Sequence, residues 1–386
     1  MAESQRVKQA RVPDSKPPPK AMSAWQVALT ELLEGFVESS TTAFLALLVG
    51  LGLGIFALFW FFSPSTIAGP MGAYLPRSSS DAAAFATREA LVLGRTPVRA
   101  PRMLILGPST IAQAIALGDT LSTEIESNSG IPWNVHVLTT PVQSPFDQMA
   151  LIETALKNHD PEGPPVLIVL GVGLQRLGWS MERLTEYESM ARIGVRSDWV
   201  DEEMLMLGMQ PRARTGIYLL DNYRFVIGER TETIVRLALQ RPVPRTVDIY
   251  SKGQSMNLGE RPYKSMLFQI TAGQADASTY FELHARLAER LEAFPGVYLA
   301  FIEEPLAPDF LAARGLLDEQ AGMHVALREF TRRIGAVYWP VVTEAGLQPA
   351  DYHDNLHLKR GPAQERVQRA LARHVSDFAR HLQDTP

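Results

Sequence analysis

One stretch of this sequence limits the fold more than any other, because it has the length and composition of a membrane-spanning helix. Residues Ala43 to Phe62 read AFLALLVGLGLGIFALFWFF and contain no charged residue. About 20 apolar residues, coiled as a helix, span the hydrocarbon core of a bilayer. The run starts too late for a cleaved signal peptide, and Ser63-Pro64 lacks the small-residue pattern of a cleavage site. We therefore predict one uncleaved transmembrane helix over residues 43–62.

The segments around this helix predict its topology. Residues 1–42 form a tail that includes a Pro-rich start and an amphipathic stretch over residues 24–38. A short tail, one span and a large following domain are typical of a protein whose N-terminus stays in the cytoplasm, so we expect residues 1–42 there. Gly50 and Gly54 form a GxxxG pair, which either packs against another membrane helix or faces lipid.

Composition excludes several classes of function. The net charge of -5 gives no electrostatic case for binding nucleic acid. The chain has no cysteine, which excludes disulfides, thiolate metal sites and a cysteine nucleophile. No cluster of His, Asp and Glu has the spacing of a metal site, and no glycine-rich dinucleotide fingerprint opens a helix. We therefore predict neither a metal nor a cofactor.

The sequence after the predicted span, residues 63–386, predicts an α/β fold. Residues 63–100 are rich in Pro, Gly and Ser and are expected to form a stalk. From residue 101 to 386, apolar runs alternate with helical patterns, which is typical of a parallel sheet in a three-layer α/β/α domain. A mostly helical insertion over about residues 175–272 interrupts the pattern, with helices expected over residues 201–208, 213–227 and 232–240 and a polar loop over residues 251–264. The strand candidates are Met103–Leu106, Val135–Thr139, Val166–Leu170, Val297–Ile302 and Ala336–Trp339.

A serine stands at the point where the first strand changes into a helix. In the stretch LILGPSTIAQAI, Ser109 follows the apolar run by three residues and precedes a helical pattern over residues 111–127. Ligands of open parallel sheets bind beyond the carboxyl ends of the strands, so a nucleophile fits there. A plain helix N-cap explains the same residue, and on Ser109 alone it is the favoured interpretation.

A second polar stretch, YHDNLHLKRG, precedes the last helix and contains an Asp-His pair. Asp354 stands three residues before His357, and no other histidine in the chain has an Asp three positions before it. This spacing lets the carboxylate reach Nδ1 of the imidazole and leaves Nε2 free to face a nucleophile. Asp351 with His353 forms a second, less favoured pair. Glu303 and Glu304 follow the fourth strand, and we expect them to be a solvated pair in a loop.

The G-x-S after the first strand and the D-x-x-H-L near the C-terminus resemble the SGNH, or GDSL-like, hydrolase superfamily over residues 101–383. The resemblance implies that Ser109 is the nucleophile, His357 the base and Asp354 the residue that orients the base. The family's oxyanion hole uses a Gly after the second strand and an Asn after the third. Here residues 139–144 contain no Gly, and Gly173 replaces the Asn. The candidate oxyanion donors are Ser109, Gly171, Gly173 and Gln143.

A membrane anchor joined to such a domain resembles the accessory proteins of cell-surface polysaccharide O-acetylation. The resemblance implies a serine acyltransferase or esterase with a degenerate oxyanion hole, attached by a single span to a bacterial inner membrane with its domain in the periplasm. Its expected partners are an exported polysaccharide and a multi-span acyltransferase or polysaccharide synthase. The alternative is a non-catalytic subunit that binds a glycan or a membrane synthase.

Overall fold

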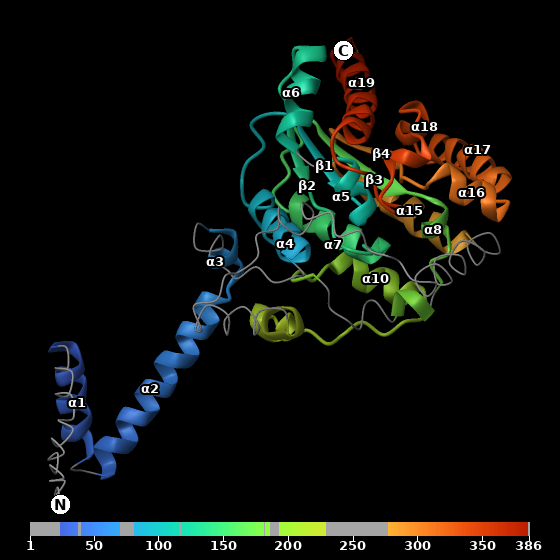
Figure 1. The fold of residues 1–386 in the computed structure, drawn as a ribbon. Helices are drawn as coiled ribbons and strands as arrows, with labels where there is room; N and C mark the ends of the chain where they lie inside the picture. The colour runs from blue at the N-terminus through green and yellow to red at the C-terminus, as the bar shows by residue number, and fades with distance from the viewer. Residues whose placement is uncertain are drawn as a thin grey trace, which may run out of the picture. The chain divides into compact units, whose positions relative to one another are not determined.

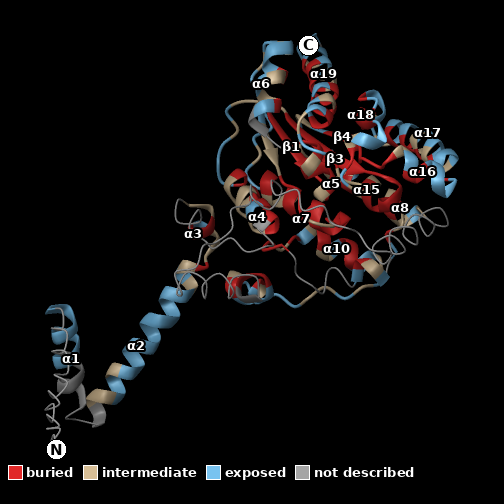
Figure 2. Ribbon diagram, in the orientation of Figure 1, coloured by how far each residue is buried: buried red, intermediate tan, exposed pale blue. Residues whose placement is uncertain are grey.

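The structure is a computed structural model that describes residues 24–37, 40–69, 81–115, 118–180, 182–185, 193–228 and 277–384. It divides into two units, Met1–Trp60 and Phe61–Pro386. The first contains helix α1 (Ala24–Val37) and most of helix α2 (Ser40–Phe61). The segment Thr42–Phe61 of α2 is long and apolar enough to cross a membrane, and its side chains are not buried inside the protein (Figure 2).

The second unit is built on a sheet of five parallel strands with the order β2-β1-β3-β4-β5 (Figure 1). The predicted α/β class with a parallel sheet is therefore confirmed. The strands are β1 (Arg102–Leu106), β2 (Asn134–Val137), β3 (Val166–Val172), β4 (Val297–Glu303) and β5 (Val337–Trp339).

Strands β1 and β3 form the centre of the core, because every residue in both is buried. The order of the strands reverses at β1, since the chain passes from β1 to β2 on one side and then to β3 on the other. The carboxyl ends beside such a reversal are where parallel sheets bind ligands. Leu106, the last residue of β1, pairs with Leu170, and β3 continues beyond it to Val172, so the carboxyl ends of the two strands lie close together.

Helices connect the strands and pack against one another. Helix α6 (Gly118–Ser129) contacts the long C-terminal helix α19 (Pro362–Asp384), while α7 (Pro145–Leu156) contacts α15 (Ser278–Leu291). Helices α16 (Pro308–Arg314) and α17 (Leu317–Arg333) connect β4 to β5, and α18 (Val341–Glu344) follows β5.

The helix predicted over residues 111–127 is instead two helices. Helix α5 (Ser109–Ala114) ends at Ile115, whose φ of -131° and ψ of 57° lie outside the helical region. Helix α6 then begins at Gly118. The apolar periodicity of the two helices runs on without a gap, which explains why the pattern alone predicted one element.

Part of the predicted stalk belongs to the folded unit. Helix α3 (Pro64–Ala68) is capped by the Ser63 side chain, and α4 (Asp81–Leu93) packs against α7. Ala86 and Ala90 of α4 are completely buried in that contact. Small side chains allow the two helices to approach closely, so the Ala-rich stretch is a packing surface. Residues 70–80 of the predicted stalk lie outside the described residues.

The predicted insertion begins with α8 (Leu174–Leu177) and continues through α10 (Asp198–Met206) and α11 (Tyr218–Asp221) to a π-helix (Arg224–Gly228). The helix predicted over residues 213–227 is thus shorter and partly irregular. The predicted helix over residues 232–240 and the polar loop over residues 251–264 lie outside the described residues.

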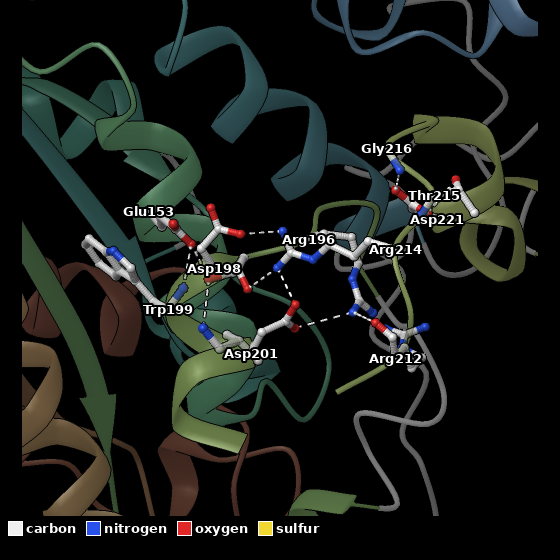
Figure 3. A network of polar contacts seen from close by, with 12 residues as sticks. Glu153, Arg196, Asp198, Trp199, Asp201, Arg212, Arg214, Thr215, Gly216 and Asp221 are labelled. Carbon is white, nitrogen blue, oxygen red and sulfur yellow. Dashed lines mark hydrogen bonds and ion pairs between the residues drawn. The ribbon is translucent and has the colours of Figure 1, made fainter. Parts of the chain in front are cut away.

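Polar contacts attach the start of α10 to α7 (Figure 3). The Glu153 carboxylate of α7 accepts hydrogen bonds from the Ser197 hydroxyl and from the Trp199 backbone N–H. Burial raises the pKa of Glu153, and the hydrogen bonds from Ser197 and Trp199 oppose that shift. Arg214 bridges the acidic face of α10, with 2.6 Å between Nη2 and Asp201 Oδ2. These contacts join the described part of the insertion to the sheet domain.

Candidate active site

Ser109 lies just beyond the carboxyl end of β1, in the first turn of α5. Gly107 makes the bend with a φ of +152°, and a Cβ there would lie 2.8 Å from the Ile111 side chain. Pro108 occupies the N-cap of α5, with extended backbone angles and no capping side chain. Ser109 is therefore the first helical residue. The N-cap interpretation of its hydroxyl is wrong, and the hydroxyl is left to another partner.

That partner is the imidazole of His357. The Ser109 Oγ lies 3.0 Å from His357 Nε2, and His357 Nδ1 lies 2.8 Å from Asp354 Oδ2. Three residues from two ends of the domain thus form one continuous array of hydrogen bonds. With Nδ1 donating its proton to the carboxylate, Nε2 is left as an acceptor for the serine proton.

A tight loop before α19 holds the imidazole. Tyr352 and Leu358 form an antiparallel bridge, and the His353 N–H donates to the His357 carbonyl over 2.8 Å. The Ala307 N–H donates to the Asn355 carbonyl, which ties this loop to the segment after β4. The loop is therefore fixed at the carboxyl edge of the sheet.

The Asp354 carboxylate accepts hydrogen bonds from two backbone N–H groups as well as from the His357 imidazole. Its Oδ1 receives the N–H groups of Leu356, at 2.7 Å, and His357, at 2.8 Å. Burial raises the pKa of Asp354, but the hydrogen bond and charge of His357 and these two backbone donors together lower it by more. The pKa of Asp354 therefore lies below its ordinary value, and the carboxylate is ionised at neutral pH.

The alternative Asp-His pair is separated. The Asp351 carboxylate accepts from Arg366 Nη2 at 2.6 Å and from the Gln348 N–H at 2.7 Å. His353 is exposed to solvent. Asp351 thus ties the loop to α19, and its carboxylate is bonded to groups other than His353.

Among the backbone N–H groups at this edge of the sheet, those of Ser109 and Gly173 donate no hydrogen bond within the described residues. Ser109 follows β1, and Gly173 follows β3 as the N-cap of α8. Because β1 and β3 are neighbours, both donors are candidates for binding an oxyanion.

The other two candidate donors, Gly171 and Gln143, have structural contacts of their own. Gly171 lies within β3, where a Cβ would lie 2.3 Å from Ile111 Cγ1, so the absence of a side chain makes room for α5. Gln143 is buried, and its Nε2 donates to the Leu138 carbonyl over 2.8 Å. An oxyanion role for either residue stays a prediction.

The loop after β2 contains a left-handed residue at a position where the sequence has no glycine. Val142 has a φ of +50°, and it is the one non-glycine residue with positive φ among the described residues. A β-branched side chain is disfavoured in this conformation, which glycine adopts freely. The loop therefore keeps a glycine-like bend in a segment without glycine. Such strain is concentrated at functional sites in proteins.

The two glutamates at the end of β4 are buried, so the prediction of a solvated pair in a loop is wrong. Glu303 and Glu304 are 4% and 1% exposed, so they are not a solvated pair. Glu303 accepts from the Thr343 N–H at 2.7 Å and from the Thr343 hydroxyl at 3.0 Å. Glu304 accepts from side chains that follow β1 and β3. Their position directly after an apolar strand, at the same edge as Ser109, was the available signal.

No protein-family model matches this chain, and no curated protein sequence matches it significantly. Within the described ranges, no group of three or more His, Asp or Glu side chains is placed to hold a metal ion. The chemistry of the site therefore has to be inferred from its own residues.

Proposed function

We propose that this chain is a serine acyltransferase or esterase that acts on O-acyl groups of an exported cell-surface polysaccharide. The observation that carries the proposal is the hydrogen-bonded array of Ser109, His357 and Asp354. Its order of hydroxyl, imidazole and carboxylate is the arrangement that activates serine in unrelated acyl-transfer enzymes. The resemblance to the SGNH hydrolases, with an α/β/α domain and an insertion, supports the same reaction class.

The geometry suggests how each group acts. The Ser109 oxygen attacks the carbonyl carbon of an acyl ester while His357 Nε2 takes the serine proton. The N–H groups of Ser109 and Gly173 stabilise the negative charge that develops on the carbonyl oxygen. When the C–O bond to the sugar breaks, His357 returns the proton to the departing oxygen. Asp354 holds the imidazole in the tautomer that both steps require.

The resulting acyl-serine ester is resolved by a second attack. A sugar hydroxyl gives transfer of the acyl group, and water gives hydrolysis. His357 takes the proton of the attacking hydroxyl in either case, and the Ser109 oxygen leaves with that proton. The array serves both outcomes equally, so the acceptor that reaches the site decides between them.

The membrane helix suggests where the reaction takes place. We place α2 in a bacterial inner membrane as a single span, with the sheet domain in the periplasm and an exported glycan as substrate. A multi-span acyltransferase or polysaccharide synthase is the partner that supplies acyl groups or glycan. A C-terminal alkaline phosphatase fusion, which is active only outside the cytoplasm, tests the orientation. An inactive but intact fusion contradicts it.

The main experiment uses the full chain in detergent micelles. We expect a fluorophosphonate probe to label the wild type and p-nitrophenyl acetate to be hydrolysed, with both signals lost in Ser109→Ala. Ser180→Ala is the matched control, because Ser180 is exposed and its hydroxyl accepts a hydrogen bond from the Arg183 N–H. Release of acetate from an acetylated oligosaccharide, compared with p-nitrophenyl acetate, tests the substrate class.

One observation favours a second candidate, a non-catalytic subunit that binds a glycan or a membrane synthase. Gly173 provides no side-chain amide for an oxyanion, and losing one such donor costs about 10²–10³ in kcat in well-studied enzymes. A folded wild type that neither reacts with the probe nor turns over substrate, but binds the glycan, supports this candidate and overturns the first.

A further inference from the structure

Glu304 is a buried carboxylate that connects two loops of the candidate active site. Its side chain is 0% exposed, and it follows the last residue of β4. Thr110 of α5 donates to Oε2 over 3.0 Å, and Gln175 Nε2 of α8 donates to the same oxygen over 2.8 Å. Arg176 Nε donates to Oε1 over 3.1 Å. The donors thus come from the segments after β1 and β3.

The pairing explains how a carboxylate is tolerated at this depth. An ionised carboxyl group without partners is costly to bury, so buried carboxylates are paired and hydrogen-bonded. Arg176 supplies the opposite charge, and its own side chain is only 10% exposed. Thr110 and Gln175 satisfy the remaining acceptor capacity of Oε2. Loss of any of these donors would leave a buried carboxylate oxygen with fewer partners, so the contacts of all three with Glu304 are energetically favoured.

The same three donors are neighbours of the unpaired backbone N–H groups. Thr110 directly follows Ser109, while Gln175 and Arg176 stand two and three residues after Gly173. The space above Gly173 is also occupied by this cluster. A Cβ on Gly173 would lie 3.0 Å from Glu304 Cβ and 2.9 Å from Gln175 Oε1. The cluster therefore stands where a side chain at residue 173 would begin.

We propose that Glu304 is a positioning residue for the proposed acyl transfer. By holding Thr110 on one side and Gln175 with Arg176 on the other, it sets the separation between the N–H groups of Ser109 and Gly173. Those two groups are the donors to the oxyanion, so their spacing has to match the transition state. This inference rests on the proposed function, because Glu304 acts only through the two backbone donors that the proposed function assigns to the oxyanion.

The test compares Glu304→Gln with Glu303→Gln in the full chain, using p-nitrophenyl acetate. Glu303 is the matched control, because it is the preceding residue, is also buried, and contacts Thr343 and Gln320. We expect kcat of Glu304→Gln to fall about 10–100-fold with KM unchanged, because misplaced oxyanion donors affect only the transition state. Affinity for a boronic acid transition-state analogue falls by the same factor. Glu303→Gln keeps kcat within about twofold.

Thr110→Val is the second variant, and it decides the question if Glu304→Gln does not fold. It keeps the shape of the side chain and removes only the hydroxyl that reaches Glu304. We expect a smaller fall in kcat, again without a change in KM. An unchanged kcat in a folded Glu304→Gln or Thr110→Val protein overturns the inference alone. Equal losses in Glu304→Gln and Glu303→Gln also overturn it, since the effect is then general. An inactive wild type overturns the proposed function together with this inference.

Discussion

The Ser109 hydroxyl lies 3.0 Å from His357 Nε2, and 248 positions separate the two residues in the chain. Two short segments produce this contact. The bend at Gly107 and Pro108 places Ser109 at the start of α5, and the bridge between Tyr352 and Leu358 closes the loop around His357. Both segments lie at the carboxyl edge of one sheet, so the contact follows from the parallel arrangement of the strands.

Asp354→Asn tests the role of the carboxylate in this array. We expect kcat to fall by about 10³–10⁴, because an amide does not hold the imidazole in the tautomer with Nε2 free. The fold is kept, since the amide oxygen still accepts from the Leu356 and His357 N–H groups. Steady-state kinetics with p-nitrophenyl acetate measure the loss. Asp351→Asn is the control, and a loss of similar size there contradicts the assignment.

Gly171→Ala tests the close approach of β3 to α5. A new Cβ would lie 2.3 Å from Ile111 Cγ1, so the Ile111 side chain or the helix α5 that holds it has to shift. We expect the free energy of unfolding to fall by about 1–3 kcal/mol, the usual cost of overpacking a core. Urea denaturation measures the change.

Gly322→Ala is expected to raise the free energy of unfolding in the same urea assay. Gly322 lies inside α17, and a Cβ there meets no atom within 4 Å. Alanine in a helix interior is more stable than glycine by about 0.5–1 kcal/mol. Equal effects of the two substitutions contradict the packing argument at Gly171.

The backbone conformation of Val142 predicts that glycine at this position gives a more stable protein than alanine. At a φ of +50°, a residue with a Cβ is strained by about 1–2 kcal/mol, whereas glycine is not. We therefore expect Val142→Gly to be more stable than Val142→Ala by about 1 kcal/mol, the reverse of the order in regular structure. Thermal unfolding of both variants measures the difference, and alanine being the more stable contradicts the left-handed conformation.

His284 predicts how stability depends on pH. Burial lowers the pKa of His284 from 6.5 to about 4, and the hydrogen bond to the Tyr280 carbonyl only partly opposes this. Between these values the unfolded chain binds a proton that the folded chain does not. Stability is therefore complete above about pH 6.5, and up to about 3 kcal/mol is lost as the pH falls toward 4.

Denaturation of His284→Asn between pH 4 and 6.5 tests this dependence. We expect a shallower decline than in the wild type, even though the variant loses the ring contact with Tyr280. His353→Asn is the control, since His353 is exposed and its replacement leaves the slope unchanged. A slope in His284→Asn that equals that of the wild type contradicts the assignment.

Local patterns were sufficient to predict much of this protein. The apolar run over residues 43–62 predicted the helix α2, and short apolar runs predicted all five strands within a few residues. The Asp-x-x-His spacing predicted the contact between Asp354 and His357, because three residues in a tight loop suffice to form it. Each of these features depends on neighbours in the chain.

Other features depended on what the rest of the chain brings close. A serine after a strand suits a cap or a nucleophile. Pro108 in the N-cap excludes the cap, and the Ser109 hydroxyl contacts His357 instead. Two consecutive glutamates after a strand suggested a solvated loop. Glu304 is buried because Thr110, Gln175 and Arg176 supply its partners from distant segments.

By itself, the sequence determined a helix long and apolar enough to cross a membrane, the parallel α/β class and the residue types available at the carboxyl edge, since these follow from the order of residues along the chain. Only the tertiary structure decided which of these residues meet and which acids are buried. The physical reason is the strand register. Pairing Leu106 with Leu170 aligns the ends of β1 and β3, and this alignment brings the loops and their charges together.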